Sequence, residues 1–213
     1  ILGLGAGWYS EEYDSYGYRY LSAPERLVAL EETVTAVRRL WTEETVTLDG
    51  THVQLQGAYC DPKPVQAHPA IWIGGGGEKV NLRIAARHAD ATNWQVSLDS
   101  FRHKSALLEQ YCDEVGRPFD SISRTHGPDC RIFDSEKDLD RWCGSEGGGH
   151  LWGREPADQY VRDNLVGTVE QVAEKTQAFI DAGATQFVLW LRDYPGDETL
   201  RRFMGEVVPR LKG

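Results

Sequence analysis

Short apolar runs alternate with longer amphipathic stretches along the chain. Residues 1–5, 70–73 and 186–191 are continuously or nearly continuously apolar, residues 90–94 indicate a further short strand, and residues 122–133 have mixed strand character. Apolar positions at helical spacing follow them, in residues 22–41, 79–89, 101–115, 168–182 and 197–207. Alternating strands and helices predict an α/β fold with a parallel sheet and right-handed crossovers. The spacing alone is compatible with an open doubly wound sheet or with a (β/α) barrel.

Local signals mark where several of these elements begin and end. Ser22 with Glu25 and Thr168 with Gln171 form two capping boxes, which predict helix starts at these positions. Gly116 and Gly183 follow apolar helical patterns and predict helix ends. Residues 45–55 contain two alternating runs joined by an Asp-Gly pair, and this pattern predicts a β-hairpin.

Residues 134–166 break the alternation. They contain a short helical pattern near Leu139, three consecutive glycines at positions 147–149, and then His150 and Trp152. A segment of this length without regular pattern is typical of a lid or of a spacer. We therefore expect an insertion or lid at residues 134–166, and we consider His150 a candidate substrate-pocket residue.

The composition indicates a single soluble globular domain over residues 1–213. The chain is 40% hydrophobic, and it has a net charge of −10 and a pI of about 5.1. An acidic balance argues against nucleic acid or an anionic membrane as the partner. No apolar run approaches the length of a membrane span, and the cysteines show neither C-x-x-C pairs nor metal-ligand spacing. We expect a cytoplasmic protein with reduced cysteines and no metal.

The most distinctive stretch is the apolar run at 70–73 together with the glycines that follow it, Gly74, Gly75, Gly76 and Gly77. A strand, a glycine turn and a helix in this order can bind an anion, because glycines let a ligand approach the backbone and the first helical N–H groups are unpaired. Lys79 would place a cation in the first helical turn, which an adjacent anion would make favourable. The sequence matches neither the dinucleotide fingerprint nor the P-loop. A plain tight turn therefore remains the alternative to phosphate binding.

Several motifs occur in an order that resembles the bacterial luciferase-like monooxygenase superfamily, in particular its oxidoreductases that use the deazaflavin coenzyme F420. No single motif is diagnostic, but the match extends over almost the whole chain. The motifs are Gly3-Leu4-Gly5-Ala6-Gly7-Trp8 with Glu12 and Tyr16-Gly17, Arg26 with Glu31-Glu32, Asp49-Gly50, Ile71-Trp72-Ile73-Gly74-Gly75, Ala89-Asp90 with Asn93-Trp94, and Gly167-Thr168 followed by Asp181-Ala182-Gly183.

The resemblance implies a TIM (β/α)8 barrel of the luciferase-like type, with its active site at the carboxyl ends of the strands. On that template the chain supplies the C-terminal five βα units, strands four to eight. Three βα units, roughly 100 residues, would precede it, so we expect an incomplete barrel with two open edges.

The resemblance also assigns roles to particular residues. The glycine turn would hold the cofactor phosphate, and the end of the fourth strand would approach the cofactor ring and the substrate. Residues that help to hold the ring in the resembling enzymes belong to the first three strands, so no catalytic acid or base is identified. The implied cofactor-binding residues are Gly74, Gly75, Gly76, Gly77, Gly5, Gly7, Trp8 and Glu11 or Glu12, and the implied substrate-pocket residues are Asn93 and Trp94. Lys79, beside the turn, and His150, in the insertion, are added as candidates from the sequence pattern itself. Rim packing is the competing interpretation of Trp8 and Trp94.

Three functions follow as hypotheses. The first is an oxidoreductase that transfers a hydride between coenzyme F420 and a small organic substrate. The second is a monooxygenase of the same superfamily that uses FMN, and the third is a non-catalytic truncated barrel that binds a flavin. A small molecule is the expected partner in the first two, and a homodimer is a candidate assembly.

Overall fold

The computed structural model describes residues 1–144 and 156–212, which form two compact units. The first unit contains Ile1–Asn93 and Ala106–Ser123, and the second contains Trp94–Ser105 and the chain from Arg124 onward. Each unit is described by itself below. The expectation of one domain over residues 1–213 stays a prediction.

The first unit is built on a parallel sheet in the order β1 (Leu2–Leu4), β4 (Ile71–Gly74) and β5 (Ala91–Trp94). Leu4 lies opposite Ile73, and Gly74 lies opposite Asn93. All three carboxyl ends therefore lie at one edge of the sheet, as predicted from the alternation of strands and helices.

Helices α2 (Ala23–Thr42) and α3 (Asn81–His88) belong to this unit and contact each other. Leu30 and Val34 in α2, and Leu82 and Ala86 in α3, are spaced four residues apart and are almost fully buried. The predicted capping box at Ser22 is present, because the Glu25 carboxylate accepts hydrogen bonds from the Ser22 N–H (2.9 Å) and hydroxyl (2.6 Å). Helix α3 begins only at Asn81, two residues later than the sequence pattern suggested.

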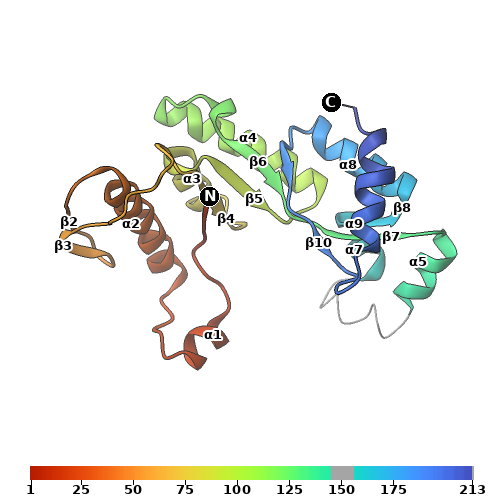
Figure 1. Cartoon of the computed structure of the whole chain (residues 1–213), viewed down its shortest axis with the longest axis horizontal. Coiled ribbons are helices and arrows are strands. Elements are labelled where there is room, and N and C mark those ends of the chain that lie inside the picture. Colours follow the sequence, from red (N-terminus) through yellow and green to blue (C-terminus); the bar gives the residue numbers. More distant parts are fainter. Residues whose placement is uncertain (145–155, 213) are drawn as a thin grey trace. The chain divides into compact units, whose positions relative to one another are not determined.

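The predicted hairpin is confirmed as β2 (Val46–Asp49) and β3 (Gln54–Ala58), and it lies beside the end of α2 (Figure 1). The Glu32 carboxylate on α2 accepts hydrogen bonds from the N–H groups of residues 51, 52 and 53, at 2.8, 2.8 and 2.9 Å. This carboxylate thus fixes the hairpin loop to the helix. The loop after β1 carries a short helix that the sequence pattern did not reveal, α1 (Ser10–Ser15), and extends away from the sheet (Figure 1).

The second unit contains only parallel strand pairs among its described residues. Strand β6 (Ser123–His126) pairs with β9 (Gln186–Phe187), and β7 (Asp129–Phe133) lies between β10 (Trp190–Leu191) and β8 (Leu165–Thr168). Gly127 and Pro128 interrupt the strand predicted over 122–133. Pro128 has no N–H to donate, so the sheet breaks there, and the strand predicted over 186–191 is divided into β9 and β10 at the same level.

Helix α4 (Leu98–Val115) is shared between the units: its N-terminal part belongs to this unit and its C-terminal part to the first. The other helices of this unit are α5 (Glu136–Cys143), α7 (Ala157–Asp163), α8 (Val169–Asp181) and α9 (Glu198–Arg202), followed by η2 (Phe203–Val207) and η3 (Val208–Arg210). The capping box at Thr168 and the helix ends at Gly116 and Gly183 are confirmed, since both glycines have positive φ. The helix predicted over 197–207 continues into η3, which contains Pro209.

The described part of the predicted insertion is more regular than the sequence pattern indicated. It contains α5, α7 and the start of β8, a strand that was not predicted. Leu165 and Val166 are fully buried beside β7, so tertiary pairing supplies an order that four residues could not signal by periodicity. Its role as a lid stays a prediction.

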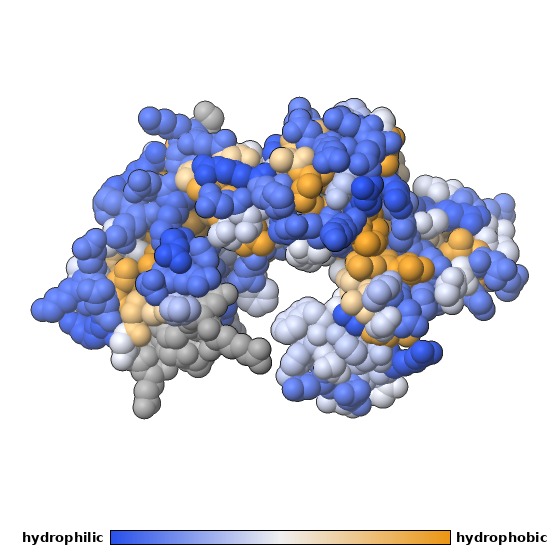
Figure 2. All heavy atoms as spheres, turned by 180° about the vertical axis from the view of Figure 1, so that it is seen from behind, coloured by the Kyte–Doolittle hydropathy of each residue, from blue (hydrophilic) through white to orange (hydrophobic). Residues whose placement is uncertain are grey.

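Within each unit the described strands form open sheets, not a closed barrel. Hydrophobic atoms reach the surface between hydrophilic ones (Figure 2). Exposed apolar side chains include Ile1, Val28 and Val65 in the first unit and Leu200 and Met204 in the second. Ile1 precedes the edge strand β1, whereas the others lie in helices or loops. Single exposed apolar side chains of this kind are common on protein surfaces.

Candidate functional site

A hollow of about 610 Å³ lies in the first unit at the carboxyl ends of β1 and β4. Its size is that of a site for a small molecule or a cofactor. Its walls are mostly backbone and apolar side chains, together with two asparagines. The lining residues are Gly3, Leu4, Gly5, Ala6, Gly7, Trp8, Leu27, Trp72, Gly74, Gly75, Gly76, Gly77, Asn81 and Asn93.

The glycine turn is shaped so that side chains would disturb it. Gly75 has φ of 116°, which an L-residue rarely adopts, and a Cβ there would lie 3.2 Å from Asn81 Nδ2. A Cβ at Gly77 would lie 3.3 Å from Asn81 Cβ. Gly75, Gly76 and Gly77 are all exposed and line the hollow, so a ligand there would contact the turn.

Asn81, the first residue of α3, holds this turn in place. Its Nδ2 donates hydrogen bonds to the carbonyl oxygens of Gly74 (3.2 Å) and Gly75 (3.1 Å). The side chain is 4% exposed, and its Oδ1 is buried without a hydrogen-bond partner among the described residues. Buried amide oxygens are normally bonded, so this unsatisfied acceptor at the wall of the hollow is unusual.

Arg26 on α2 holds the opposite wall. Its Nε donates to the carbonyl oxygen of Gly7 (3.2 Å), its Nη1 donates to that of Leu21 (2.5 Å), and its guanidinium stacks on the Tyr20 ring at 4.3 Å. Tyr20 in turn donates to the carbonyl oxygen of Trp8 (3.0 Å). The loop that carries Gly7 and Trp8 is thereby connected to the rigid helix, although the Trp8 side chain itself is 82% exposed.

The hollow brings together most of the predicted site residues of the first unit. The two glycines after β1, Trp8, Asn93 and the four-glycine turn all line it. Lys79 lies in the turn before α3, is exposed and is not among the lining residues, because α3 starts two residues after it. Glu11 lies on α1, where it accepts a hydrogen bond from the Tyr9 hydroxyl (2.6 Å), and it does not line the hollow either.

Trp94 belongs to the core of the second unit and not to the wall of the hollow. It is 1% exposed, and its ring packs edge to face on Phe101 with centroids 5.3 Å apart. Alternation along β5 separates it from Asn93, since neighbouring strand residues point to opposite faces. Packing, the competing interpretation, therefore describes its position. His150 lies outside the described residues.

Six lining residues were not among the predicted site residues: Gly3, Leu4, Ala6, Leu27, Trp72 and Asn81. Trp72 could have been found, because it alternates in β4 with the fully buried Ile71 and Ile73 and so points to the other face. Leu27 and Asn81 carry no such signal, since their contribution depends on how α2 and α3 pack.

None of the described lining residues has a titratable side chain. Two strongly shifted groups lie in the second unit instead. Burial lowers the pKa of His126 to about 4, although the Trp94 carbonyl, 3.0 Å from Nδ1, raises it, and the ring stacks on Phe179 at 3.8 Å. Burial likewise lowers the pKa of Lys175 to about 8, although the charge of Asp163 opposes the shift.

The contacts of Lys175 and His126 connect elements of the fold to one another. The ammonium group of Lys175 donates to the backbone carbonyls of Val161, Asn164 (3.2 Å) and Val166 (3.0 Å), which joins α8 to α7 and β8. His126 is fully buried among aromatic rings. Within the described chain, the hollow can therefore position a ligand but contributes no acid or base of its own.

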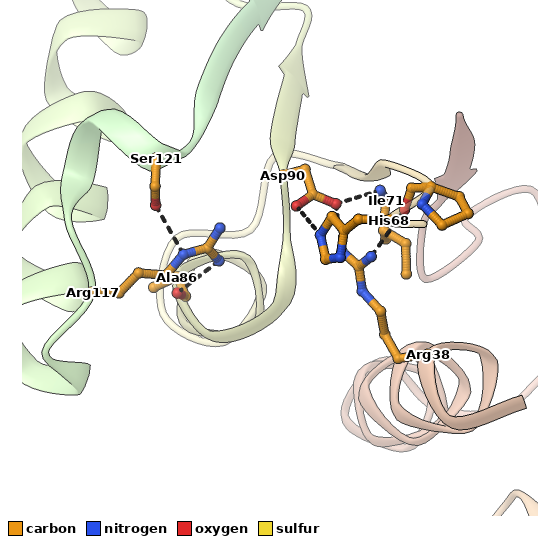
Figure 3. A network of polar contacts seen from close by, with 8 residues as sticks. Arg38, His68, Ile71, Ala86, Asp90, Arg117 and Ser121 are labelled. Carbon is orange, nitrogen blue, oxygen red and sulfur yellow. Dashed lines mark hydrogen bonds and ion pairs between the residues drawn. The ribbon is translucent and has the colours of Figure 1, made fainter. Parts of the chain in front are cut away.

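The amino ends of β4 and β5 carry a polar network (Figure 3). Asp90, just before β5, pairs with Arg38 on α2, accepts from the Ile71 N–H (2.7 Å) and lies 3.1 Å from His68 Nε2. Arg38 also donates to the Pro69 carbonyl (2.9 Å). Partial burial would raise the pKa of Asp90, but these hydrogen bonds outweigh it and hold the pKa below its usual value.

Arg117 forms a second bridge near this network. It donates to the Ser121 hydroxyl (3.0 Å) and to the Ala86 carbonyl at the end of α3 (3.3 Å) (Figure 3). These contacts connect neighbouring elements of the fold, and we interpret them as stabilising the structure and not as binding a ligand.

The described residues contain no group of three or more histidine, cysteine, aspartate or glutamate side chains that could hold a metal ion. The four cysteines are unpaired, and Cys112 and Cys130 are buried. No helix in the described part of the chain combines the length and the apolar character that crossing a bilayer requires.

Known proteins share this architecture and parts of this sequence. A solved structure titled F420-dependent secondary alcohol dehydrogenase in complex with an F420-acetone adduct superimposes with a TM-score of 0.76 at 20% identity, over 99% of this chain and 69% of that one. An F420-dependent glucose-6-phosphate dehydrogenase of Intrasporangium calvum is 25% identical over the whole chain and 70% of its own length. An uncharacterized protein of Mycobacterium tuberculosis is 35% identical over 89 residues, which span 42% of this chain and only 30% of that protein.

The family model described as luciferase-like monooxygenase matches residues 1–153. The structural neighbours share the α/β fold with parallel sheets, and the resemblance read from the motifs is confirmed. The chain belongs to the luciferase-like monooxygenase family and has the fold of its TIM barrels, of which the described strands form an unclosed part.

Proposed function

We propose that this protein is an oxidoreductase that transfers a hydride between coenzyme F420 and a small organic substrate. The observation that carries the proposal is the hollow at the carboxyl ends of β1 and β4, in a chain whose family and relatives include F420-dependent enzymes. In barrels of this kind the carboxyl ends of the strands are where ligands bind. The reaction, its direction and the substrate are parts of the proposal.

The glycine turn suits the phosphate of such a cofactor. A phosphate needs several donors at close range, and the exposed backbone of Gly75, Gly76 and Gly77 can approach it without interference from side chains. The start of α3 adds the partial positive charge of a helix N-terminus. Lys79, exposed in the same turn, adds a full positive charge nearby.

The apolar side of the hollow suits the ring system. Leu4, Ala6, Leu27 and Trp72 supply a wall that favours a flat conjugated ring over water. Trp8 lies on the loop that Arg26 holds, and its exposed indole is free to stack on a ring. Asn93, on the neighbouring strand, brings a polar group to the same hollow and is our candidate for contact with the substrate.

The bound deazaflavin would supply the hydride chemistry. The described residues would hold the phosphate, orient the ring and keep water from one face of it. No described lining residue moves a proton, so any acid or base lies elsewhere. Glu11 and His150 stay predictions for contacts with the cofactor and the substrate, and residues 134–166 stay a predicted lid.

The experiment is a binding and turnover measurement on the full chain. We expect F420 to bind with micromolar or tighter affinity, measured by the change in its fluorescence. With glucose 6-phosphate or a secondary alcohol as trial substrates, the absorbance of oxidised F420 should fall. Tight binding of FMN with no binding of F420 would reject the proposed cofactor.

The second candidate is an FMN-dependent monooxygenase, which membership of the luciferase-like monooxygenase family favours. The same turn would hold the FMN phosphate, and reduced FMN with oxygen would replace F420 in the assay. Binding of either cofactor without turnover of any substrate would favour the third hypothesis, a non-catalytic flavin-binding protein. A homodimer and a cytoplasmic location stay predictions.

A further inference from the structure

Asn81 has one amide atom with two partners and one with none. The two atoms that face its amide from the turn are the carbonyl oxygens of Gly74 and Gly75, and carbonyl oxygens can only accept hydrogen bonds. The atom near them is therefore the NH₂ group, and the orientation of the amide is fixed. The atom left over is Oδ1, an acceptor.

The position of this acceptor ties it to the hollow. Asn81 lines the hollow and is only 4% exposed, and no described group donates a hydrogen bond to Oδ1. Gly75 and Gly77 lie against the same side chain and carry no side chains of their own. A small group of a ligand can therefore approach Asn81 between them, with a slight movement of the exposed turn.

The chemistry of the missing partner follows from its surroundings. An ionised phosphate oxygen would repel Oδ1, because both atoms carry negative charge and neither donates. A hydroxyl group can donate to Oδ1 and, being uncharged and small, fits beside a phosphate held by the turn. A buried acceptor without a donor is costly, so a ligand that brings one gains affinity.

We propose that Asn81 is a specificity residue that recognises a hydroxyl group on the polyol chain of the ligand, next to its phosphate. This inference rests on the proposed function, since F420 and FMN both carry a phosphate on a hydroxylated ribityl chain. The amide then has two tasks: Nδ2 shapes the turn and Oδ1 selects a phosphorylated polyol over a phosphorylated alkyl chain.

The test compares ligands that differ only in these hydroxyl groups. The probes are F420 and FMN, each paired with a synthetic counterpart in which hydrogen atoms replace the ribityl hydroxyls. We expect the full wild-type chain to bind the hydroxylated member roughly 5- to 20-fold more tightly, the range for one hydrogen bond to a buried acceptor. The measured quantity is the ratio of the two dissociation constants.

Two variants separate recognition from folding. Asn81→Ala removes the acceptor, so the ratio should fall to about one, a limit set by the loss of that hydrogen bond. Asn81→Asp keeps an acceptor but loses the donor to the turn and adds charge, so both ligands should bind less tightly while a preference remains. Asn164→Ala is the matched control, because both amide atoms of Asn164 are bonded within the second unit. It should lower stability and leave the ratio unchanged.

The outcomes distinguish the inference from the proposed function. If the wild-type chain binds both members of a pair equally well, or if Asn81→Ala keeps the wild-type ratio, the inference is overturned while the cofactor assignment stands. If neither F420 nor FMN binds the wild-type chain, the proposed function is overturned and the inference with it.

Discussion

At the amino ends of β4 and β5, Asp90 is surrounded by donors, whereas at the carboxyl ends Asn81 keeps an acceptor that no described group satisfies. Both residues lie in the first unit, and both are largely withdrawn from solvent. At the amino ends, the hydrogen bonds of Asp90 connect β5 to α2, to β4 and to the loop that carries His68. The other end leaves backbone and an amide oxygen available beside a hollow.

The difference shows how one small sheet separates stability from binding. Polar groups that satisfy one another stabilise the fold but have nothing to offer a ligand. Buried groups left unsatisfied destabilise the fold and gain their partners only when a ligand arrives. Variants at the two ends should therefore affect different measurements.

The largest effect is expected for Asp90→Ala. It removes the partner of Arg38 and leaves the Ile71 N–H without its acceptor, so the free energy of unfolding should fall by about 2–3 kcal/mol. Denaturant unfolding measures the loss, and Asp90→Asn, which keeps an acceptor, should lose less. Cofactor affinity of the folded fraction should not change. A large loss of affinity with unchanged stability would contradict the comparison.

Gly75→Ala is expected to act at the other end. Its φ of 116° and the nearby Nδ2 of Asn81 make a side chain unfavourable, so the turn should shift and cofactor affinity should fall about tenfold, with a stability loss of about 1–2 kcal/mol. Isothermal titration with F420 and FMN measures the affinity. Gly205→Ala is the control, because a Cβ at Gly205 meets nothing within 4 Å and φ is not positive there. If Gly75→Ala binds the cofactor as tightly as the wild type does, the turn is not part of the binding site.

Trp8→Ala, at the same hollow, should lower cofactor affinity less than Gly75→Ala does. The indole is 82% exposed, so its removal should leave stability unchanged, but a lost stacking contact should weaken cofactor binding by about fivefold. Fluorescence titration measures it. Tyr194→Ala, which removes another aromatic ring that is 87% exposed in the second unit, is the matched control. Equal affinities in wild type and Trp8→Ala would favour rim packing as the role of Trp8.

The smallest effect is expected in the pH dependence of stability. The pKa of Asp90 is lower in the folded chain than in the unfolded one, so its contribution is complete above the unfolded pKa of about 4 and is lost as the pH falls through the folded pKa. The difference in unfolding free energy between wild type and Asp90→Asn should therefore shrink in acid. Because the carboxylate is partly exposed, solvent screening keeps this change below about 1 kcal/mol. A difference that grows in acid would contradict the sign.

Much of the fold could be predicted because the relevant signals are local. Capping boxes at Ser22 and Thr168, positive-φ glycines at 116 and 183 and the Asp-Gly hairpin each follow from a few neighbouring residues. Strand β8 could not be predicted, because its four residues are ordered by pairing with β7. The break between β9 and β10 could not be predicted for the same reason. It lies opposite the break at Pro128 between β6 and β7, the strands with which β9 and β10 pair.

The candidate site was predictable where it is backbone and unpredictable where it depends on packing. Glycines at the ends of β1 and β4 indicated the hollow directly. Trp94 and Asn93 are adjacent in sequence, yet strand alternation sends Trp94 into the core. Lys79 was placed in the first turn of a helix that begins only at Asn81.

The sequence by itself determined the alternation of strands and helices, the family and the glycine turn, because periodicity, caps and glycine conformations are properties of short segments. Only the tertiary structure decided which side chains meet. It brought Asn81 from α3 against the turn after β4 and Asp90 against Arg38 from α2, contacts between elements that lie far apart along the chain or that depend on the exact start of a helix. Hydrogen bonds of this kind depend on the positions of whole elements, and no short segment of sequence encodes them.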